Sequence, residues 1–120
     1  MNKRKLGEEK ERFVCEYLKT GGYRILEQNF RCRFGEVDIV ARHGKYLVFI
    51  EVKYRRSDAS GLPQEAVDVR KQRVISRVAL YYLHRYGYVE TTPVRFDVVA
   101  VSGEKDFSVA LYQNAFDFCG

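Results

Sequence analysis

The chain has 120 residues, of which 46% are hydrophobic and 31% are charged, a balance typical of one globular domain with a single core. No apolar run approaches the length of about 20 residues that a membrane span needs, and no apolar segment follows the basic N-terminus. The sequence therefore argues against a membrane protein and against a signal peptide. The three cysteines, Cys15, Cys32 and Cys119, have no paired spacing, which favours a reduced, cytoplasmic protein over a disulfide scaffold or a zinc site.

The basic charge is concentrated in the middle of the chain. The formal net charge is +5, and residues 31–77 hold 11 basic and 6 acidic residues, while the remaining residues hold 10 of each. A local basic surplus suits a polyanion such as nucleic acid. Ordinary solubilising charge explains the same count, so the count alone does not decide between the two.

Hydrophobic periodicity predicts one α/β domain over residues 1–120, with elements in the order α-β-β-β-α-β-β. We expect helices over 5–19 and 63–85, and strands over 23–30, 37–42, 45–54, 94–101 and 108–112. Gly21-Gly22 ends the first helix, and Pro63 is placed to open the second. A tight turn is predicted at His43-Gly44, and a polar loop over 57–62.

The third strand carries its charges at one end. Side chains alternate across a strand, and both faces of this one are apolar until Glu51 and Lys53, which predicts a central strand covered on both sides. Pairing with the second strand through the turn at His43-Gly44 places Asp38 opposite Phe49. Asp38 is then diagonal to Glu51 on one face, about 7–8 Å away at the backbone. A slip of one residue would move Asp38 to the other face, so the prediction depends on this register.

Two neighbouring carboxylates repel each other unless a divalent cation lies between them. Oxygen ligands with waters left in place suit Mg²⁺, and such an ion polarises a phosphoryl oxygen and activates water. Lys53 would position that water or stabilise charge that develops on the phosphate. Asp38, Glu51 and Lys53 together therefore indicate a phosphodiester-cleaving site. The alternative is a surface ion pair between Glu51 and Lys53, because so short a motif often arises by chance.

Two helical side chains are predicted to lie near these carboxylates. Spacing predicts the apolar face of the first helix to consist of Phe13, Val14, Tyr17 and Leu18. Glu11 precedes Val14 and Leu18 by three and seven residues, which places it on that face, where a carboxylate needs a partner. On the second helix, Gln64 and Lys71 extend the apolar stripe. They either point toward the carboxylates or lie at the edge of the core with their polar ends in water.

Arginines near the carboxylate strands are candidates for contacts with a phosphate backbone. Those that flank the two strands are Arg31, Arg33, Arg55 and Arg56. A further stripe on the second helix consists of Arg70, Arg73, Arg77 and His84, with Tyr81 between them. This stripe fits a phosphate-binding surface and an ordinary solvated helix face equally well.

The segment GEVDIV, followed by LVFIEVKYR, resembles the YraN-like family of uncharacterised bacterial proteins. That family looks related to Holliday junction resolvases and to the PD-(D/E)xK nuclease superfamily. The resemblance covers nearly the whole chain, because it extends to YLKTGGYRILEQNFR, LPQEAVDVRKQRVISRVALYYL, VRFDVVAV and QNAF. It implies a restriction-endonuclease-like core, in which a mixed sheet has helices on both sides.

The resemblance also implies roles for single residues. Asp38 and Glu51 match metal ligands, Lys53 matches the catalytic lysine, and Glu11 matches an acidic position on the first helix. Two departures stand out. Val37 replaces the superfamily's proline before the aspartate, and Lys10 replaces the glycine that usually precedes the helical glutamate. Because a Gly-Glu pair stands earlier, at 7–8, Glu8 remains a second candidate for the helical carboxylate, although helical phase favours Glu11.

These observations lead to three hypotheses. The first is a Mg²⁺- or Mn²⁺-dependent nuclease acting on DNA, with branched or otherwise structured DNA among its substrates. Glu11, Asp38 and Glu51 would hold the ion and Lys53 would assist the attacking water. The phosphate backbone would be held by Arg31, Arg33, Arg55, Arg56 and Lys71. The second hypothesis is a nucleic-acid-binding module that does not cut, and the third is an interaction protein with structural ion pairs. A resolvase-like function would favour a homodimer, because two strands must be cut symmetrically.

Overall fold

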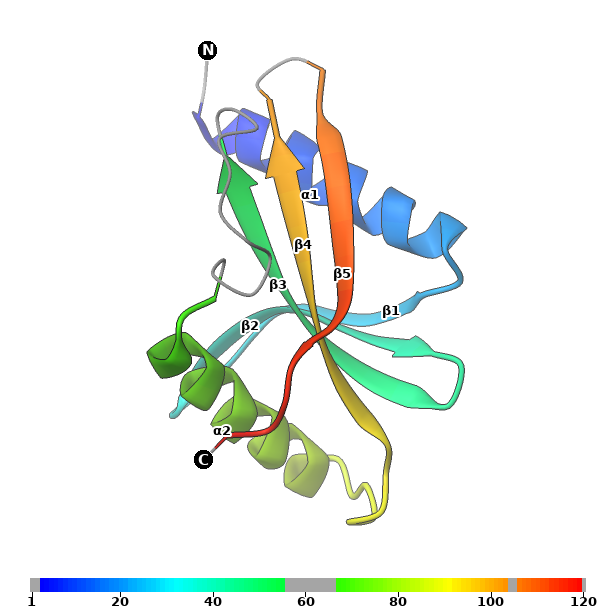
Figure 1. The fold of residues 1–120 in the computed structure, drawn as a ribbon, viewed down its shortest axis with the longest axis vertical. Coiled ribbons are helices and arrows are strands. Elements are labelled where there is room, and N and C mark those ends of the chain that lie inside the picture. Colours follow the sequence, from blue (N-terminus) through cyan, green and yellow to red (C-terminus); the bar gives the residue numbers. More distant parts are fainter. Residues whose placement is uncertain (1–2, 56–66, 104–105, 120) are drawn as a thin grey trace.

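The computed structural model describes residues 3–55, 67–103 and 106–119. Its elements are α1 (Lys3–Thr20), β1 (Arg24–Cys32), β2 (Gly35–His43), β3 (Tyr46–Arg55), α2 (Val69–Arg85), β4 (Val94–Ser102) and β5 (Ser108–Phe116). This order is the predicted one, and it confirms an α/β fold with a mixed five-stranded sheet (Figure 1).

The strands follow one another across the sheet in the order β1-β2-β3-β4-β5. The β3–β4 pair is parallel and the other three pairs are antiparallel. A parallel pair needs a crossover between its strands, and the connection that contains α2 supplies it. Figure 1 shows β3, β4 and β5 running together along the long axis, while β1 and β2 turn away from them near the middle of the molecule.

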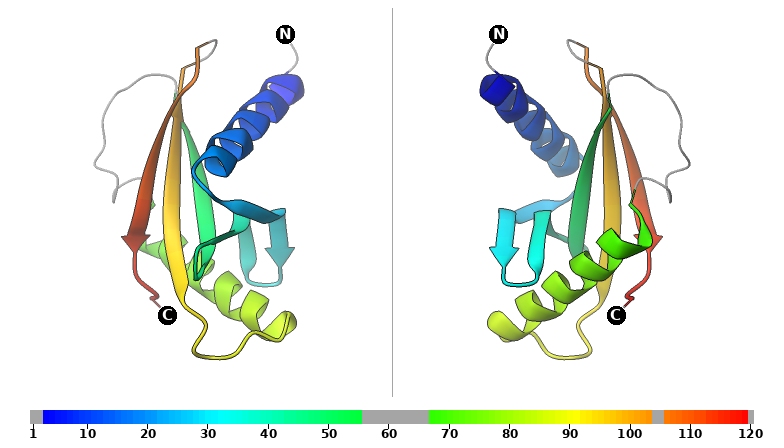
Figure 2. Two further views of the ribbon diagram at one scale, coloured as in Figure 1. Left: turned by 90° about the vertical axis from the view of Figure 1, so that its right-hand side faces the viewer. Right: turned by 90° about the vertical axis from the view of Figure 1, so that its left-hand side faces the viewer.

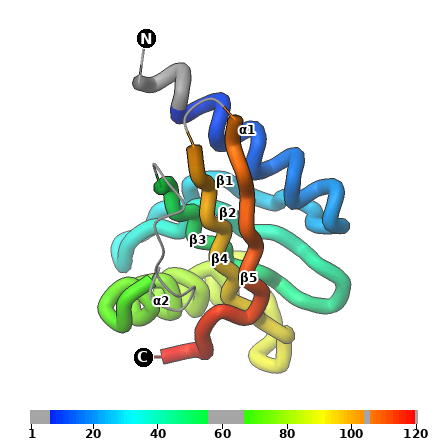
Figure 3. The backbone as a smooth tube through the Cα atoms, turned by 45° about the horizontal axis from the view of Figure 1, so that its top comes forward, coloured from blue at the N-terminus to red at the C-terminus, as the bar shows by residue number. Residues whose placement is uncertain are grey.

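Each helix covers its own apolar core on one side of the sheet. Val48 and Ile50 of β3 belong to the α1 core, whereas Leu47 and Phe49 belong to the α2 core. The helical residues of the two cores are Val14, Cys15 and Leu18 of α1, and Ile75, Val78, Ala79 and Tyr82 of α2. Figures 2 and 3 show the strands between the two helices. The predicted central strand, covered on both faces, is confirmed.

The face that α1 buries is narrower than the predicted one. Val14 and Leu18 are buried as expected, but Phe13 is 40% exposed and Tyr17 is 38% exposed. The helix contacts the sheet along the line of Val14, Cys15 and Leu18, so side chains beside that line reach solvent.

Neither helix that the structure describes is long and apolar enough to cross a membrane. The three cysteines are free, as predicted.

The second helix begins later than predicted. Val67 and Asp68 precede it, and the Asp68 side chain accepts a hydrogen bond from the Lys71 amide at 2.8 Å as the N-cap of α2. The predicted start at Pro63 is therefore wrong over residues 67–68, because an aspartate cap fixes the first turn more strongly than an upstream proline. Pro63, Gln64 and the predicted loop 57–62 lie outside the described residues. β5 continues to Phe116, four residues beyond its predicted end.

The predicted pairing of β2 with β3 is wrong by two residues. His43 pairs with Tyr46, so the loop residues are Gly44 and Lys45. Gly44 has a φ of 60°, and a two-residue hairpin loop with glycine first accommodates this left-handed conformation. A shift of two residues keeps every side chain on its predicted face, because the side-chain period of a strand is two. The predicted meeting of Asp38 with Glu51 does not depend on this error.

Candidate active site

Asp38 lies where β2 separates from β3. The ladder between the two strands ends at the pair Ile39–Ile50, and Asp38 is the next residue of β2. Its Oδ2 accepts a hydrogen bond of 2.8 Å from the amide of Val52. The carboxylate therefore satisfies a backbone amide at the point where the strand ladder has stopped. This bond fixes Asp38 against the C-terminal half of β3.

Glu51 is a buried carboxyl group with an acidic neighbour. It is 7% exposed, and its Oε2 lies 3.4 Å from Nζ of Lys71 on α2, whose side chain is 42% exposed. Burial, followed by hydrogen bonding to and repulsion from Asp38, raises the pKa of Glu51 to about 8, while Lys71 acts in the opposite direction. Burial and the acidic neighbour therefore both favour the protonated form of Glu51 in the folded chain.

A pocket of about 60 Å³ opens beside Asp38 on the α1 side of the sheet. Its lining includes Glu11, Cys15, Asp38 and Tyr54. Burial raises the pKa of Tyr54 to about 12, and the nearby charges of Glu11 and Asp38 add to this effect. Glu11 is exposed at this pocket rather than buried in the core. Glu8 is also exposed, and Glu11 rather than Glu8 is among the residues that line this pocket beside Asp38.

The predicted carboxylates meet in pairs and not as a trio. Among the residues that the structure describes, no three His, Cys, Asp or Glu side chains form a group that could hold a metal ion. Glu51 contacts α2, Glu11 comes from α1, and Asp38 lies at the strand separation between them. The pair of Asp38 and Glu51 fits Mg²⁺, which is commonly held by one or two protein carboxylates together with waters and substrate phosphates. Glu11 as a third ligand stays a prediction.

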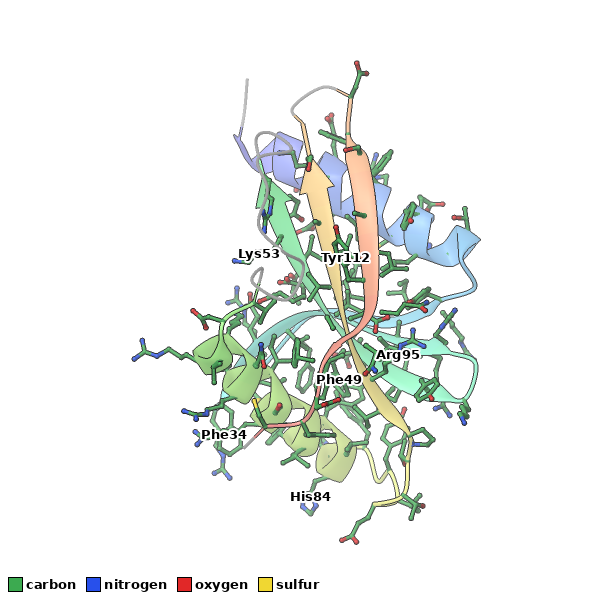
Figure 4. The ribbon with its side chains drawn as sticks, viewed as in Figure 1. Phe34, Phe49, Lys53, His84, Arg95 and Tyr112 are labelled. Carbon is green, nitrogen blue, oxygen red and sulfur yellow. The ribbon has the colours of Figure 1, made fainter. Side chains whose placement is uncertain are left out.

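The predicted basic residues have different surroundings. Lys53 is exposed on β3, two residues after Glu51 (Figure 4), and Lys71 contacts Glu51 directly. Arg31 forms an ion pair with Glu36. Arg33 lies over the ring of Phe34, and Arg55 is partly buried. Arg56 lies outside the described residues.

The sequence prediction missed a buried polar cluster on β4. Asp97 is 0% exposed, and four donors reach its carboxylate. The donors are Tyr23 Oη at 2.7 Å, Arg95 Nε at 2.9 Å, Arg95 Nη2 at 2.8 Å and the Asn114 amide at 3.0 Å. Arg95 Nη2 also lies 3.0 Å from Nδ1 of His43. The one sequence signal is the carboxylate inside the apolar run FDVVAV. Arg95 lies on the same strand, but Tyr23 and Asn114 come from distant parts of the chain, which periodicity cannot bring together.

Comparisons with known proteins find sequence relatives over nearly the whole chain. The family model described as "Uncharacterised protein family UPF0102" matches residues 10–101. A UPF0102 protein of Lachnoclostridium phytofermentans is 49% identical over 120 residues, covering 100% of this chain and 99% of its own. A UPF0102 protein of Syntrophus aciditrophicus is 51% identical over 114 residues, covering 94% of this chain and 87% of its own.

A solved structure, "The structure of Pyrococcus Furiosus SfsA in complex with Ca2+", matches with a TM-score of 0.40 and 12% identity. The match covers 93% of this chain and 64% of that one, and a likeness of this size supports no statement about activity. The sequence relatives establish the family of this chain, and they confirm the predicted resemblance to an uncharacterised bacterial family. The chain belongs to the UPF0102 family.

Proposed function

We propose that this protein is a divalent-metal-dependent nuclease that hydrolyses phosphodiester bonds in DNA, with branched DNA among its substrates. One observation carries the proposal, namely the buried Glu51 carboxyl group held beside Asp38, where the half-exposed Lys71 is its one counter-charge among the described residues. Such an arrangement costs folding free energy, because both burial and a neighbouring negative charge oppose ionisation. Strongly perturbed carboxyl groups of this kind occur preferentially at functional sites.

Each residue of the site has a role in this proposal. Asp38 and Glu51 hold Mg²⁺ or Mn²⁺, and Glu11 supplies a third oxygen ligand from the pocket side. When bound, the ion neutralises the two carboxylates and stabilises charge that develops on the phosphoryl group. Lys53 shares a face of β3 with Glu51, so its ammonium group orients the attacking water. Lys71 favours the ionised form of Glu51, which is the form that binds a cation.

The fold supports the same proposal. A mixed sheet with a helix on each side, a carboxylate where two strands separate and Glu-x-Lys on the next strand together resemble the PD-(D/E)xK nucleases. In this proposal Arg31, Arg33, Arg55 and Arg56 hold the phosphate backbone of the substrate. Symmetric cutting of a branched substrate requires two copies of the chain, so we also propose a homodimer.

The test is cleavage of labelled four-way-junction, duplex and single-stranded DNA in Mg²⁺ or Mn²⁺. We expect wild-type protein to cut and Glu51→Gln to lose roughly 100-fold or more of the rate, as removal of one electrostatic group at a reacting phosphate typically does. Glu16→Gln is the matched control, because it removes one exposed carboxylate of α1 that lies outside the site. Cutting that is equal in Glu51→Gln and wild type would contradict the proposal.

A binding module on the same fold is the second candidate. It is favoured by the absence of a three-carboxylate metal group among the described residues. This function predicts tight, salt-sensitive binding of DNA with no cutting in any divalent ion, and binding that Glu51→Gln leaves intact.

A further inference from the structure

Helix α2 presents an arginine stripe without acidic residues. Its sequence, VRKQRVISRVALYYLHR, holds five Lys and Arg residues and no Asp or Glu. Arg70, Arg73 and Arg77 are exposed and fall on one side of the helix at 3.6 residues per turn. Tyr81 follows Arg70 by three turns and extends the same stripe. A solvated helix face normally carries both signs of charge, so a face with one sign favours an anionic partner.

These arginines have no acidic partner in the part of the chain that the structure describes. Within residues 3–55, 67–103 and 106–119, none of Arg70, Arg73 and Arg77 has an ion pair, whereas the neighbouring Arg31 is paired with Glu36. Their charges are therefore available to phosphate groups, which is the property that gives nucleic-acid binding its salt dependence.

The turn between β1 and β2 adds an aromatic side chain to this stripe. Cys32 pairs with Gly35, so Arg33 and Phe34 form the two-residue tip of a hairpin. A Cβ atom at Gly35 would lie 2.5 Å from Val74 Cγ1, which shows that the tip rests directly on α2. This close contact holds the tip in place. Figure 4 shows Phe34 beside α2, with His84 farther along the helix.

Phe34 is placed as a stacking surface. It is 39% exposed, its ring centroid lies 6.2 Å from that of Tyr81, and the Arg33 guanidinium lies 4.9 Å from its centroid. A partly exposed ring with Arg33 beside it, at a hairpin tip that packs on the helix of the arginine stripe, matches the combination of basic groups and aromatic rings that binds single-stranded nucleic acid. A duplex hides the faces of its bases, so this ring discriminates in favour of unpaired bases.

The arginine stripe starts next to the candidate active site, because Arg70 directly precedes Lys71 in the first turn of α2. Lys71, in the first turn of α2, contacts Glu51. From Lys71 to Tyr81 the helix rises about 15 Å at about 1.5 Å per residue. This distance corresponds to about four nucleotides at about 3.4 Å per step of a stacked strand.

We infer that an unpaired stretch of nucleic acid runs along α2 from the Glu51–Lys71 contact to Phe34. Its phosphates bind Arg70, Arg73 and Arg77, and one of its bases stacks on Phe34. The inference deepens the proposed function, on which it rests for the chemistry at Glu51, and it assigns single-stranded segments as the preferred substrate class. The binding itself requires no cleavage, so the two can be tested separately.

The first test is fluorescence anisotropy with labelled single-stranded and duplex 16-mers in EDTA, where no cutting takes place. The variant Arg70→Gln/Arg73→Gln/Arg77→Gln is expected to bind the single strand about 10- to 100-fold more weakly at low salt. The slope of log affinity against log salt should fall by about two, at about 0.7 per phosphate contact. The matched control is Arg12→Gln/Lys19→Gln/Arg24→Gln, which removes three exposed charges from α1 and the start of β1. An equal loss of affinity in both triple variants would overturn the inference, because it would show that binding depends on the net charge of the protein rather than on the α2 surface.

The second test concerns the stacked base. Phe34→Leu keeps an apolar side chain but removes the ring, and it should weaken binding of the single strand by about 5- to 100-fold, with little effect on the duplex. Phe13→Leu is the matched control, because Phe13 is a similarly exposed phenylalanine on α1, at 40%. Equal weakening for single strand and duplex, or none for either, would overturn the stacking role.

The outcomes separate this inference from the proposed nuclease activity. Loss of binding in the α2 variant without any metal-dependent cutting by wild type supports the α2 surface and contradicts the nuclease. Cutting that Glu51→Gln abolishes, together with wild-type binding by the α2 variant, contradicts the α2 surface and leaves the nuclease standing. A wild-type protein that binds neither 16-mer at low salt overturns the inference outright.

Discussion

Glu51 and Asp97 are both buried acidic residues on adjacent central strands, yet their surroundings are opposite. Asp97 accepts two hydrogen bonds from Arg95 and two more from Tyr23 and the Asn114 amide. Glu51 has Asp38 as an acidic neighbour and one half-exposed lysine at 3.4 Å. The first carboxylate is fully compensated by the protein, and the second is not.

The difference separates a carboxylate that stabilises the packing of strands from one whose charge the described residues balance only in part. A buried charge that is paired and hydrogen-bonded helps to specify how strands pack, because moving either partner leaves the other charge buried without a counter-charge. A buried carboxyl group with an acidic neighbour lowers stability unless something from solution compensates it. In this protein, Tyr23, Arg95 of β4 and Asn114 of β5 supply the donors to Asp97, whereas Glu51 faces Asp38 and has Lys71 as its counter-charge.

The largest expected effect is on stability, from Asp97→Ala. This change leaves Arg95, whose side chain is 11% exposed, without its carboxylate, and it should reduce the free energy of unfolding by about 3–5 kcal/mol. Urea denaturation at low temperature measures the loss. Adding Arg95→Leu to the same variant should restore part of it, since no charge then remains unpaired. A loss below about 1 kcal/mol would mean that the cluster is dispensable.

An intermediate effect is expected from Glu51→Gln, with the opposite sign. The pKa of Glu51 is about 8 in the folded chain against an ordinary 4.5, so the folded chain binds more protons between these values. The stabilisation that Glu51 contributes to the wild-type protein is therefore fully present below pH 4.5. It is lost as the pH rises through the folded-state pKa of about 8. Glutamine does not titrate, so the variant should become the more stable protein by about 1–3 kcal/mol at alkaline pH.

Thermal and urea unfolding between pH 4 and 9, in EDTA, measure this change. Glu16→Gln is the control, because its exposed carboxylate has no acidic neighbour comparable to Asp38. Millimolar Mg²⁺ should raise the stability of wild type more than that of Glu51→Gln, since only the wild-type site offers both carboxylates. A constant difference between the two proteins at all pH values would contradict the proposed environment of Glu51.

The smallest effect is expected from Lys71→Met. Lys71 opposes the rise in the Glu51 pKa, so its removal should move the titration of Glu51 to higher pH. Because the lysine side chain is 42% exposed, its contribution to stability is screened by water and should stay within about 1 kcal/mol. Carboxyl chemical shifts of Glu51 against pH measure the change. Lys19→Met, which breaks the exposed pair with Glu16, should leave those shifts where they are.

The sequence by itself determined the elements, their order and the meeting of Asp38 with Glu51. Alternation along β3 and the period of α2 are local properties, since the side chains that point into a core repeat every two residues in a strand and every three or four in a helix. The same alternation kept the carboxylates on the predicted face even though the predicted register was wrong by two residues.

Only the tertiary structure decided how those carboxylates are compensated. Asp97 obtains its donors from residues up to 74 positions away in the chain, and Glu51 obtains Lys71 from the helix within the crossover connection. Tertiary packing also decides three other features of the site. They are the separation of β2 from β3 at Asp38, the approach of Glu11 from α1 and the packing of the hairpin tip that carries Phe34 on α2. Local patterns in the chain specify which face a side chain takes, whereas its partners depend on how distant strands and helices pack.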